Sequence, residues 1–408
     1  MADVGLPTID SLEVRDRRVL VRCDLNVPLD HGKVGDDLRI KAAIPTLELL
    51  LKRGARVAVC SHLGRPKGTV VEELRLAPVG ERLQELLGSP ITVASDVVGS
   101  GAKAACASTD KVVLLENLRF EPGEESNDPS LADQLAGLAE AYVDDAFGAA
   151  HRAHASIVGV AERLPAAAGL LLSHEVQHLD RVLHNPERPF VTVLGGAKVS
   201  DKLGVIENLL DRADAICIGG AMAFTLLAAQ GHGVGRSLVE RDRIAEVAEL
   251  LAAASKRTVR VLLPTDVVAA DSIEAGATYE TVPLAEIGAR IGVDIGPAST
   301  ELFSRCIVEA KTVLWNGPMG IFERAEYAAG TKGVAQAIEA ATRAGAYTVA
   351  GGGDSAAALA RFGMSDAVSH LSTGGGASLE YLEGKDLPGI AALKKSSEAH
   401  DKTKGSGS

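Results

Sequence analysis

The stretch Phe190–Lys198, FVTVLGGAK, places five apolar or β-branched residues directly before a glycine pair and a lysine. Such a run is typical of a buried strand in a parallel sheet, and the glycines after it let the backbone approach an anion closely. The same order of apolar run, polar or glycine-rich loop and amphipathic segment recurs along the chain. Further runs lie at 19–21, 56–59, 112–115, 141–143, 215–218, 259–263, 312–315 and 347–350. Strands that alternate with helices predict an α/β fold with mainly parallel sheets covered on both faces.

A helical pattern followed by two X-Pro pairs near the middle of the chain indicates two domains. At 408 residues the chain is longer than one ordinary core accommodates. Residues Leu170–Leu183 have apolar positions at helical spacing, and two X-Pro pairs, Asn185-Pro186 and Arg188-Pro189, follow them. Because proline disfavours helical backbone in the residue before it, we expect one connecting helix that ends here. The charged residues Lys394–Ser408 end in Gly-Ser-Gly-Ser, which predicts an unstructured tail or a segment added for expression.

The composition argues against several classes of function. A net charge of −12 and an aromatic content of 3% disfavour binding to nucleic acid or to an anionic membrane. Residues Met1–Asp10 lack the apolar run of a signal peptide, and the most apolar window, Ala215–Ala229, is too short to span a membrane. The five scattered cysteines favour reduced thiols. We therefore expect a cytoplasmic protein.

Four loops in the first half place polar side chains just after a predicted strand. These side chains are Asp24, Asn26, Arg39, His62, Arg65, Arg119 and Arg152. Because the carboxyl ends of parallel strands share one edge of a sheet, we expect the basic groups to converge there. Guanidinium forks match phosphate and carboxylate oxygens, so the cluster suits a small organic acid phosphate, while Asp24 and Asn26 suit its hydroxyl.

Simpler interpretations exist for the same residues. Each arginine taken singly is explained as a solvated surface charge. His151-x-x-His154 has the spacing of a metal-ligand pair, but no cysteine lies near it and the neighbouring acids complete no recognised ligand pattern. It is the set of arginines at strand ends, in an acidic chain, that favours an anion site.

In the second half the strand-end loops carry glycine instead of arginine. Gly195–Lys202 opens a helix and contains Gly196, Lys198 and Lys202, with the two lysines four residues apart on one face. Asn316–Glu323 offers the Glu323 carboxylate to ribose hydroxyls. Gly351–Ser355 offers a string of amides and the Asp354 carboxylate, as a nucleotide phosphate with Mg²⁺ requires.

The glycine loops also have simpler interpretations. Glycine pairs often mark only tight turns, and Asp354 is equally suited to cap a helix. The chain contains neither the G-x-x-x-x-G-K-[ST] spacing nor a clean G-x-G-x-x-G, so it lacks the two commonest nucleotide motifs.

Eight segments resemble phosphoglycerate kinase in order and spacing. They are DLNVP (24–28), SHLGRP (61–66), ENLRF (116–120), YVDDAFGAAHRAHAS (142–156), GGAKVSDK (195–202), NGPMGIFE (316–323), AGGGDSAAAL (350–359) and STGGGASLEYLEGKDLPGI (372–390). The resemblance runs from about Asp10 to Leu393. It implies two Rossmann-like three-layer domains joined by a helix and hinge. It also implies a monomer that uses Mg²⁺ and transfers a phosphoryl group reversibly between 1,3-bisphosphoglycerate and ADP in glycolysis, giving 3-phosphoglycerate and ATP.

The resemblance, together with the two X-Pro pairs after the connecting helix, predicts the following division of the chain. It comprises 1–169 as the domain that binds 3-phosphoglycerate, 170–186 as the connector, 187–376 as the nucleotide domain, 377–393 as a segment that packs back on the first domain, and 394–408 as the tail.

The resemblance also implies a role for each site residue. The triose substrate is held by Asp24, Asn26, Arg39, His62, Arg65, Arg119 and Arg152. Arg39 and Lys198 stabilise the moving phosphoryl group. The nucleotide is held by Gly196, Lys202, Gly292, Glu323, Gly352, Gly353, Asp354 and Ser355, and Asp354 also holds the metal. The chain departs from the family where Leu25 replaces a common phenylalanine and where Ala149 replaces a common hydroxyl residue, which leaves no hydroxyl contact at position 149.

Two rival classes of function remain at this point. A dehydrogenase on a doubly wound fold is disfavoured by the missing glycine fingerprint. A non-catalytic phosphate-binding protein with the same fold would carry the same loops, and only an assay of ATP formation separates it from an enzyme.

Overall fold

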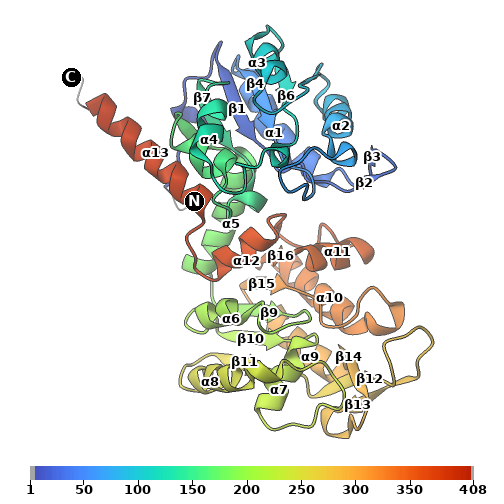
Figure 1. Ribbon diagram of the computed structural model, residues 1–408. Coiled ribbons are helices and arrows are strands. Elements are labelled where there is room, and N and C mark those ends of the chain that lie inside the picture. Colours follow the sequence, from blue (N-terminus) through green and yellow to red (C-terminus); the bar gives the residue numbers. More distant parts are fainter. Residues whose placement is uncertain (1–4, 406–408) are drawn as a thin grey trace. The chain divides into compact units, whose positions relative to one another are not determined.

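The computed structural model of the protein describes the backbone of residues 5–405 and the side chains of residues 5–398. Contacts divide the chain into two compact units, each with its own six-stranded sheet (Figure 1). Unit 1 contains the residues up to Gln177 and those from Asp386 onward, and unit 2 contains His178–Lys385.

The sheet of unit 1 is parallel throughout. Its strands, in chain order, are β1 (Arg18–Arg22), β4 (Arg56–Cys60), β5 (Thr92–Val93), β6 (Val112–Leu114), β7 (Ala141–Asp144) and β8 (Ala166–Ala168). They lie side by side in the order β5-β6-β4-β1-β7-β8. The helices are α1 (Leu38–Lys52), α2 (Ala77–Leu87), α3 (Ser100–Ala107), α4 (Pro129–Ala136), the first half of α5 (Leu170–His184), and α13 (Pro388–Gly405). A hairpin joins β2 (Leu29–Asp30) to β3 (Lys33–Val34).

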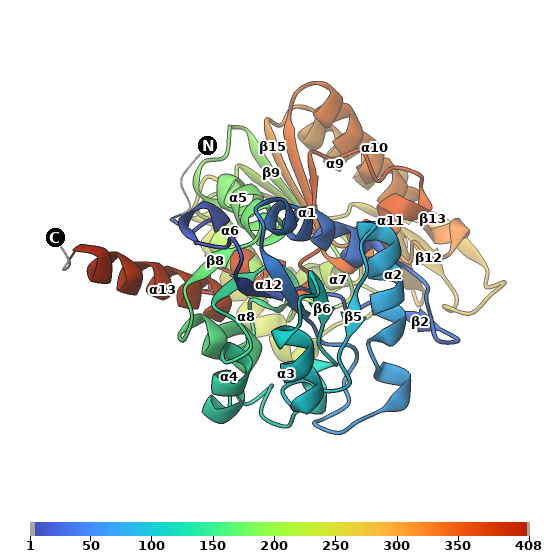
Figure 2. The same cartoon turned by 90° about the horizontal axis from the view of Figure 1, so that it is seen from above.

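The apolar runs of unit 1 form strands because both faces of the sheet are covered. All residues of β1, β6 and β7 are buried. Alternate strand residues such as Val19 and Val21 share one core with apolar residues of α1 and α2, including Leu47 and Leu83. Viewed from above, α3 and α4 lie on the other side of the strands (Figure 2). A sheet buried on both faces needs apolar residues at successive positions, which is the pattern in the sequence.

Unit 2 repeats this architecture with an added antiparallel sheet. Its parallel strands are β9 (Phe190–Leu194), β10 (Ala215–Ile218), β11 (Arg260–Leu262), β15 (Thr312–Asn316), β16 (Tyr347–Gly351) and β17 (His370–Leu371), in the order β11-β10-β9-β15-β16-β17. The antiparallel sheet, in the order β13-β12-β14, contains β12 (Asp266–Ala270), β13 (Tyr279–Pro283) and β14 (Ile291–Ile295). The helices are α6 (Leu203–Leu209), α7 (Met222–Ala229), α8 (Ile244–Ser255), α9 (Pro297–Val308), α10 (Ala329–Arg343), α11 (Gly353–Arg361) and α12 (Gly376–Leu382).

Short turns of tighter or wider helix complete the two units. They are η1 (Ile9–Ser11), η2 (Glu72–Leu74), η3 (Leu118–Phe120), η4 (Phe147–Ala149), η6 (Arg241–Arg243), η7 (Leu284–Glu286) and η8 (Ala325–Tyr327), and the π-helical η5 (Ala155–Gly159).

The α/β class with mainly parallel sheets is confirmed, and the antiparallel sheet was not predicted. Strand β13 is exposed at four of its five positions. It therefore lacks the continuous apolar pattern from which the other strands were recognised. The apolar window 215–229 consists of a buried strand, a glycine turn and a buried helix.

The contacts divide the chain at other residues than the expected domain bounds. Helix α5 spans the division, and α12 belongs to unit 2, where Asn208 donates a hydrogen bond of 2.7 Å to the carbonyl of Leu382. The return to unit 1 therefore starts at Asp386 rather than at residue 377. Helix α13 then continues to Gly405, through most of the expected tail, and residues 406–408 lie outside the described range.

None of the helices in the described part of the chain has both the length and the apolar character needed to span a membrane.

Candidate active site

The polar loops of unit 1 meet at one edge because their strands are neighbours. Strands β6, β4, β1 and β7 are adjacent and parallel, so the loops after them leave from the same side. These loops carry the predicted residues Asp24 and Asn26, His62 and Arg65, Arg119, and Arg152. The seventh predicted residue, Arg39, lies in the first turn of α1.

Two polar pairs fix the shape of this edge. The Arg39 guanidinium donates to the Asp24 carboxylate at 2.8 Å, and both side chains remain partly accessible. The backbone N–H of Gly64 donates to the side-chain oxygen of Asn26 at 2.9 Å. The pairs connect the loop after β1 to helix α1 and to the loop after β4.

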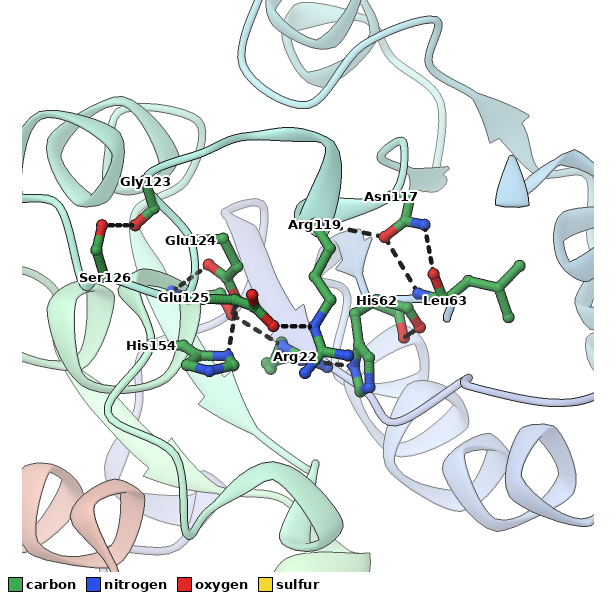
Figure 3. A network of polar contacts seen from close by, with 12 residues as sticks. Arg22, His62, Leu63, Asn117, Arg119, Gly123, Glu124, Glu125, Ser126 and His154 are labelled. Atoms are coloured by element: carbon green, nitrogen blue, oxygen red, sulfur yellow. Dashed lines mark hydrogen bonds and ion pairs between the residues drawn. The ribbon is translucent and has the colours of Figure 1, made fainter. Parts of the chain in front are cut away.

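His62 is held as a neutral imidazole by Arg22. The Arg22 guanidinium lies 3.0 Å from Nδ1 of His62 (Figure 3). Burial, with the nearby charges of Arg22 and Arg119, holds the pKa of His62 well below its usual value. Because a guanidinium only donates hydrogen bonds, Nδ1 is the acceptor and the proton resides on Nε2. His62 therefore offers an N–H donor rather than a positive charge.

Arg119 is half-buried between the same loops. It donates to the carbonyl of Gly64 at 2.8 Å and lies 3.1 Å from the Glu125 carboxylate (Figure 3). Burial is the main cause that lowers its pKa, and the charge of Arg65 acts in the same direction. Arg65 and Arg152 are both exposed. The arginines therefore provide one cationic edge in a chain whose net charge is negative.

A buried network lies beneath this edge. Ser156 Oγ accepts from Arg22 at 2.9 Å and donates to Glu124 at 2.6 Å. His154 lies 3.6 Å from the same carboxylate. Burial alone raises the pKa of Glu124, but the contacts with His154, Arg22 and Ser156 outweigh it and lower the pKa. The network keeps Arg22 charged and oriented towards His62.

The pair His151-x-x-His154 belongs to this network through the contact of His154 with Glu124. Among the described residues no group of three or more His, Cys, Asp or Glu side chains is arranged to hold a metal ion.

Unit 2 contains a cavity of about 510 Å³ at the ends of its strands. Four of the predicted nucleotide residues line it: Gly196, Gly292, Glu323 and Asp354. Phe224, Leu238 and Ile291 contribute apolar wall. A cavity of this size and mixed lining is typical of a site for a small organic ligand.

Glycine is required at two positions around the cavity. Gly220 has φ +68°, and a Cβ there would lie 2.5 Å from the backbone nitrogen of Gly196. A Cβ on Gly292 would lie 2.0 Å from the Phe224 ring. The loops after β9 and β10 therefore pack backbone to backbone, and the ring of Phe224 lies directly against β14.

Lys202 is the buried cation of this site. Its ammonium donates to the Asn316 carbonyl oxygen at 3.3 Å and to the side-chain oxygen of the same residue. Burial lowers its pKa to about 8, and the charges of Asp354 and Asp201 act against that shift. The Nδ2 donor of Asn316 is buried and makes no hydrogen bond with any residue that the structure describes.

Lys198, Glu323 and Asp354 are exposed. Burial alone raises the pKa of Glu240, but hydrogen bonds from the hydroxyl and the backbone of Ser200 outweigh it and lower the pKa, and the charge of Lys198 acts in the same direction. This contact anchors the loop that carries Lys198.

The glycine-rich loop after β16 opens helix α11. Gly352 has φ +89°, and Gly353 begins the helix with open space beside its Cα. The predicted phosphate ligand Ser355 is buried, and its hydroxyl accepts from the N–H of Gly317 at 2.7 Å. Its hydroxyl therefore links the loop after β16 to the loop after β15.

The residues around the cavity fit a nucleotide with Mg²⁺. Mg²⁺ prefers oxygen ligands and is usually held by one or two carboxylates together with phosphates and waters. Asp354 lines the cavity as an exposed carboxylate at a helix start, and the unpaired Nδ2 of Asn316 and the Lys202 ammonium supply donors for phosphate oxygens.

The sequence analysis missed the parts played by Arg22, Glu124 and Asn316. Arg22 is the last residue of a buried strand, and Asn316 is the first residue of the loop 316–323, so both lie in segments that the sequence analysis considered. Their partners lie 40 and 114 residues away along the chain, and only the fold shows the contacts.

Comparison with known proteins identifies the family. The model of the family described as phosphoglycerate kinase matches residues 9–385. Phosphoglycerate kinase of Rubrobacter xylanophilus is 55% identical over 393 residues, 96% of this chain and 99% of its own. That of Thermomicrobium roseum is 55% identical over 389 residues, 95% and 98% of the two chains.

Solved structures agree with this match. Phosphoglycerate kinase from Coxiella burnetii is 39% identical and superposes with a TM-score of 0.87 over 96% of this chain and 99% of its own. The enzyme from Pyrococcus horikoshii is 32% identical, with a TM-score of 0.83 over 96% and 100%. Both the sequence and the fold therefore show that this chain belongs to the phosphoglycerate kinase family.

Proposed function

We propose that the chain transfers a phosphoryl group reversibly between 1,3-bisphosphoglycerate and ADP, with 3-phosphoglycerate bound by unit 1 and the nucleotide bound by unit 2. As a member of the phosphoglycerate kinase family the chain is a phosphotransferase of glycolysis that acts on small molecules. The observation that supports the assignment of sites most directly is the glycine-lined cavity of unit 2. It has an apolar wall for a base, and Lys202, Asn316 and Asp354 gather near its loops for phosphates and metal.

The residues of unit 1 are suited to a three-carbon acid phosphate. Arg65, Arg119 and Arg152 would bind its anionic groups, because a guanidinium fork matches two oxygens at once. Asp24 and Asn26 would hold its hydroxyl. Neutral His62 would donate from Nε2 to a carboxylate oxygen, since Arg22 occupies Nδ1.

The residues of unit 2 are assigned to the nucleotide in the same way. Glu323 would bind the ribose, and Gly196 and Gly292 would line the base side of the cavity. Lys202, Gly352, Gly353 and the loop held by Ser355 would contact the phosphates. Asp354 would hold Mg²⁺, which when bound neutralises charge on the phosphate oxygens.

The chemistry needs alignment and charge neutralisation more than covalent help. Phosphoryl transfer spreads negative charge over the equatorial oxygens, and fixed cations stabilise it. Arg39 and Lys198 are proposed for this role. The carboxylate of 3-phosphoglycerate is a good leaving group in one direction and already deprotonated in the other, so no general base is required.

We also propose that the protein acts as a single chain in the cytoplasm. Both sets of ligands come from one chain, so we propose a monomer. All five cysteines are buried free thiols, as is usual in a reducing compartment.

A coupled assay tests the proposed function directly. Purified protein mixed with 1,3-bisphosphoglycerate, ADP and Mg²⁺ is expected to form ATP, measured through hexokinase and glucose-6-phosphate dehydrogenase. Failure to form ATP while both ligands still bind would identify a non-catalytic phosphate-binding protein. An absorbance change with nicotinamide cofactors alone would indicate a dehydrogenase.

Replacement of Arg119 or Arg152 by alanine is expected to weaken 3-phosphoglycerate binding at least tenfold and to leave Mg-ADP affinity nearly unchanged, because a charge-assisted phosphate contact is worth about 1.5–3 kcal/mol. Isothermal titration of each ligand separately measures both affinities. Arg163→Ala is the matched control, since Arg163 also donates to a glycine carbonyl at 2.8 Å and pairs with a carboxylate. Equal loss of nucleotide binding in the Arg119 and Arg152 variants would show that the sites are reversed.

Nucleotide affinity is expected to fall as pH rises through about 8. The pKa of Lys202 is lowered to about 8, so the ammonium is charged below this pH and increasingly neutral above it. Only the charged form attracts phosphates, so the Kd for Mg-ADP should rise roughly fivefold to tenfold between pH 7 and pH 9. Titration calorimetry at several pH values measures this change. Lys202→Arg should remove the pH dependence, whereas Lys332→Arg should retain it. A flat profile in the wild type would contradict the role of Lys202.

A further inference from the structure

The side chain of Asn117 makes four hydrogen bonds to the backbone of unit 1. Asn117 lies in the loop after β6 and is completely buried. Its Oδ1 accepts from the N–H groups of Leu63 and Arg119, each at 3.1 Å (Figure 3). Its Nδ2 donates to the carbonyl oxygens of Leu63 at 2.8 Å and Leu74 at 2.9 Å. A side-chain amide has two donor hydrogens and two acceptor positions, so all four are occupied.

These bonds hold the backbone on both sides of Leu63. The N–H of Leu63 belongs to the peptide group that it shares with His62, and its carbonyl belongs to the peptide group that it shares with Gly64. Because Asn117 binds both groups, the loop after β4 is fixed relative to the loop after β6. The Arg119 guanidinium adds a second link, since it donates to the carbonyl of Gly64 at 2.8 Å. The spacing of His62 and Arg119 is therefore set by contacts within the protein.

The segment 72–76 is tied to the same loop through Glu116. Glu116 is 4% exposed, and its Oε1 accepts from the N–H groups of Leu76 at 2.9 Å and Asn117 at 2.8 Å. Its Oε2 accepts from Arg75 at 3.0 Å. The chain that continues from the loop after β4 towards α2 is thus also held against the loop after β6.

A simpler role for Asn117 is to cap the short helix η3. The bond from the N–H of Arg119 is sufficient for this role. Aspartate and serine cap helices as well as asparagine does. The two bonds that Nδ2 donates have no part in capping, and an ionised carboxylate, which only accepts, would not make them. The amide therefore matches the contacts with Leu63 and Leu74 rather than the cap.

We propose that Asn117 is a positioning residue for the acid phosphate, which holds His62 and Arg119 at the spacing that this ligand needs. The proposal rests on the proposed function, in which unit 1 binds 3-phosphoglycerate. Asn117 has no hydrogen-bonding position left for the ligand, so it acts through the residues that it holds. Groups held in place before the ligand arrives bind it more tightly, because less ordering accompanies binding.

Titration calorimetry of Asn117→Asp tests the positioning role. The variant keeps the size of the side chain and its capping oxygen and loses both donors. We expect its Kd for 3-phosphoglycerate to rise at least tenfold and its Kd for Mg-ADP to stay within about twofold of the wild type, since displacement of a binding group by about 1 Å is sufficient for such a loss. Asn208→Asp is the matched control, because Asn208 of unit 2 also donates from Nδ2 to a distant carbonyl, that of Leu382 at 2.7 Å. It should leave the Kd for 3-phosphoglycerate unchanged.

Asn117→Ser provides a second variant, because a buried aspartate can impair folding. Serine is uncharged and caps η3, but it is too short to reach both Leu63 and Leu74. We expect the same selective loss of 3-phosphoglycerate affinity. Wild-type affinity in either folded variant, or an equal loss of Mg-ADP affinity, would overturn the proposal.

Hydrogen exchange measured by NMR tests the loop contacts without any ligand. In Asn117→Ser the Leu63 amide should exchange at least tenfold faster than in the wild type, because its acceptor is lost. The Gly317 amide, which donates to Ser355 in unit 2, is the internal control and should not change. Unchanged exchange at Leu63 would overturn the positioning role whatever unit 1 binds. Failure of the wild type to bind 3-phosphoglycerate, with exchange at Leu63 accelerated as expected, would instead overturn the proposed function and with it the ligand named here.

Discussion

Replacement of Lys198 by alanine is expected to lower kcat about a thousandfold, or about 4 kcal/mol of transition-state stabilisation. Lys198 is exposed in the loop after β9, four residues before the buried Lys202, on the segment that Glu240 anchors. An exposed ammonium held near the phosphate loops interacts most strongly where charge builds up during transfer. In the proposed assignment Lys202 and the backbone amides would provide the ground-state binding, so the Kd for Mg-ADP should change little.

Steady-state kinetics in the ATP-forming direction, with calorimetric Kd values, distinguish these two effects. Lys332→Ala is the control, because Lys332 is an exposed lysine in the first turn of another helix of unit 2, α10. It should keep wild-type kcat. A Lys198→Ala variant that retains more than a tenth of wild-type kcat would refute the catalytic role of Lys198.

Replacement of Arg39 by alanine is expected to lower kcat at least a hundredfold. Arg39 donates to Asp24 at 2.8 Å, and about a third of its side chain remains accessible. It therefore has donors left for a phosphoryl group while Asp24 fixes its orientation. Loss of a positioned cation that acts on transition-state charge typically costs a factor of this size or more.

Arg82 is a closely matched control for Arg39. Its side chain is 35% exposed against 37% for Arg39, and it also donates to an aspartate, Asp37. Arg82→Ala should leave kcat unchanged, and Arg39→Lys should restore only part of the activity, because an ammonium lacks the fork. Equal kcat values for the Arg39 and Arg82 alanine variants would show that Arg39 contributes only a surface charge.

Local pattern was sufficient to predict the fold class and most of its elements. Runs such as 190–194 and 312–315 are apolar at successive positions, and a strand buried on both faces is the structure that accommodates them. Helix α5 was predicted at Leu170–Leu183 and runs from Leu170 to His184. Strand β13 was missed because its exposed residues carry no apolar period.

The candidate site was predictable to the extent that its residues follow strands directly. Parallel strands bring their carboxyl ends to one edge whatever lies between them, so Asp24, His62 and Arg119 could be grouped from spacing alone. Residue type then indicated the ligand, since arginine forks and glycine-rich helix starts both suit oxyanions.

Only the tertiary structure decided which of these groups are charged, buried or already paired. His62 is neutral because burial and Arg22 disfavour its protonation, and Arg22 stays charged because Glu124, 102 residues away in the chain, lies close enough to compensate its burial. Lys202 has a lowered pKa for the same kind of reason, because burial disfavours its charged form. Composition and periodicity determine which segments fold and which face they bury. Electrostatic state depends on solvent exclusion and on distances between residues far apart in sequence, which exist only once the chain has packed.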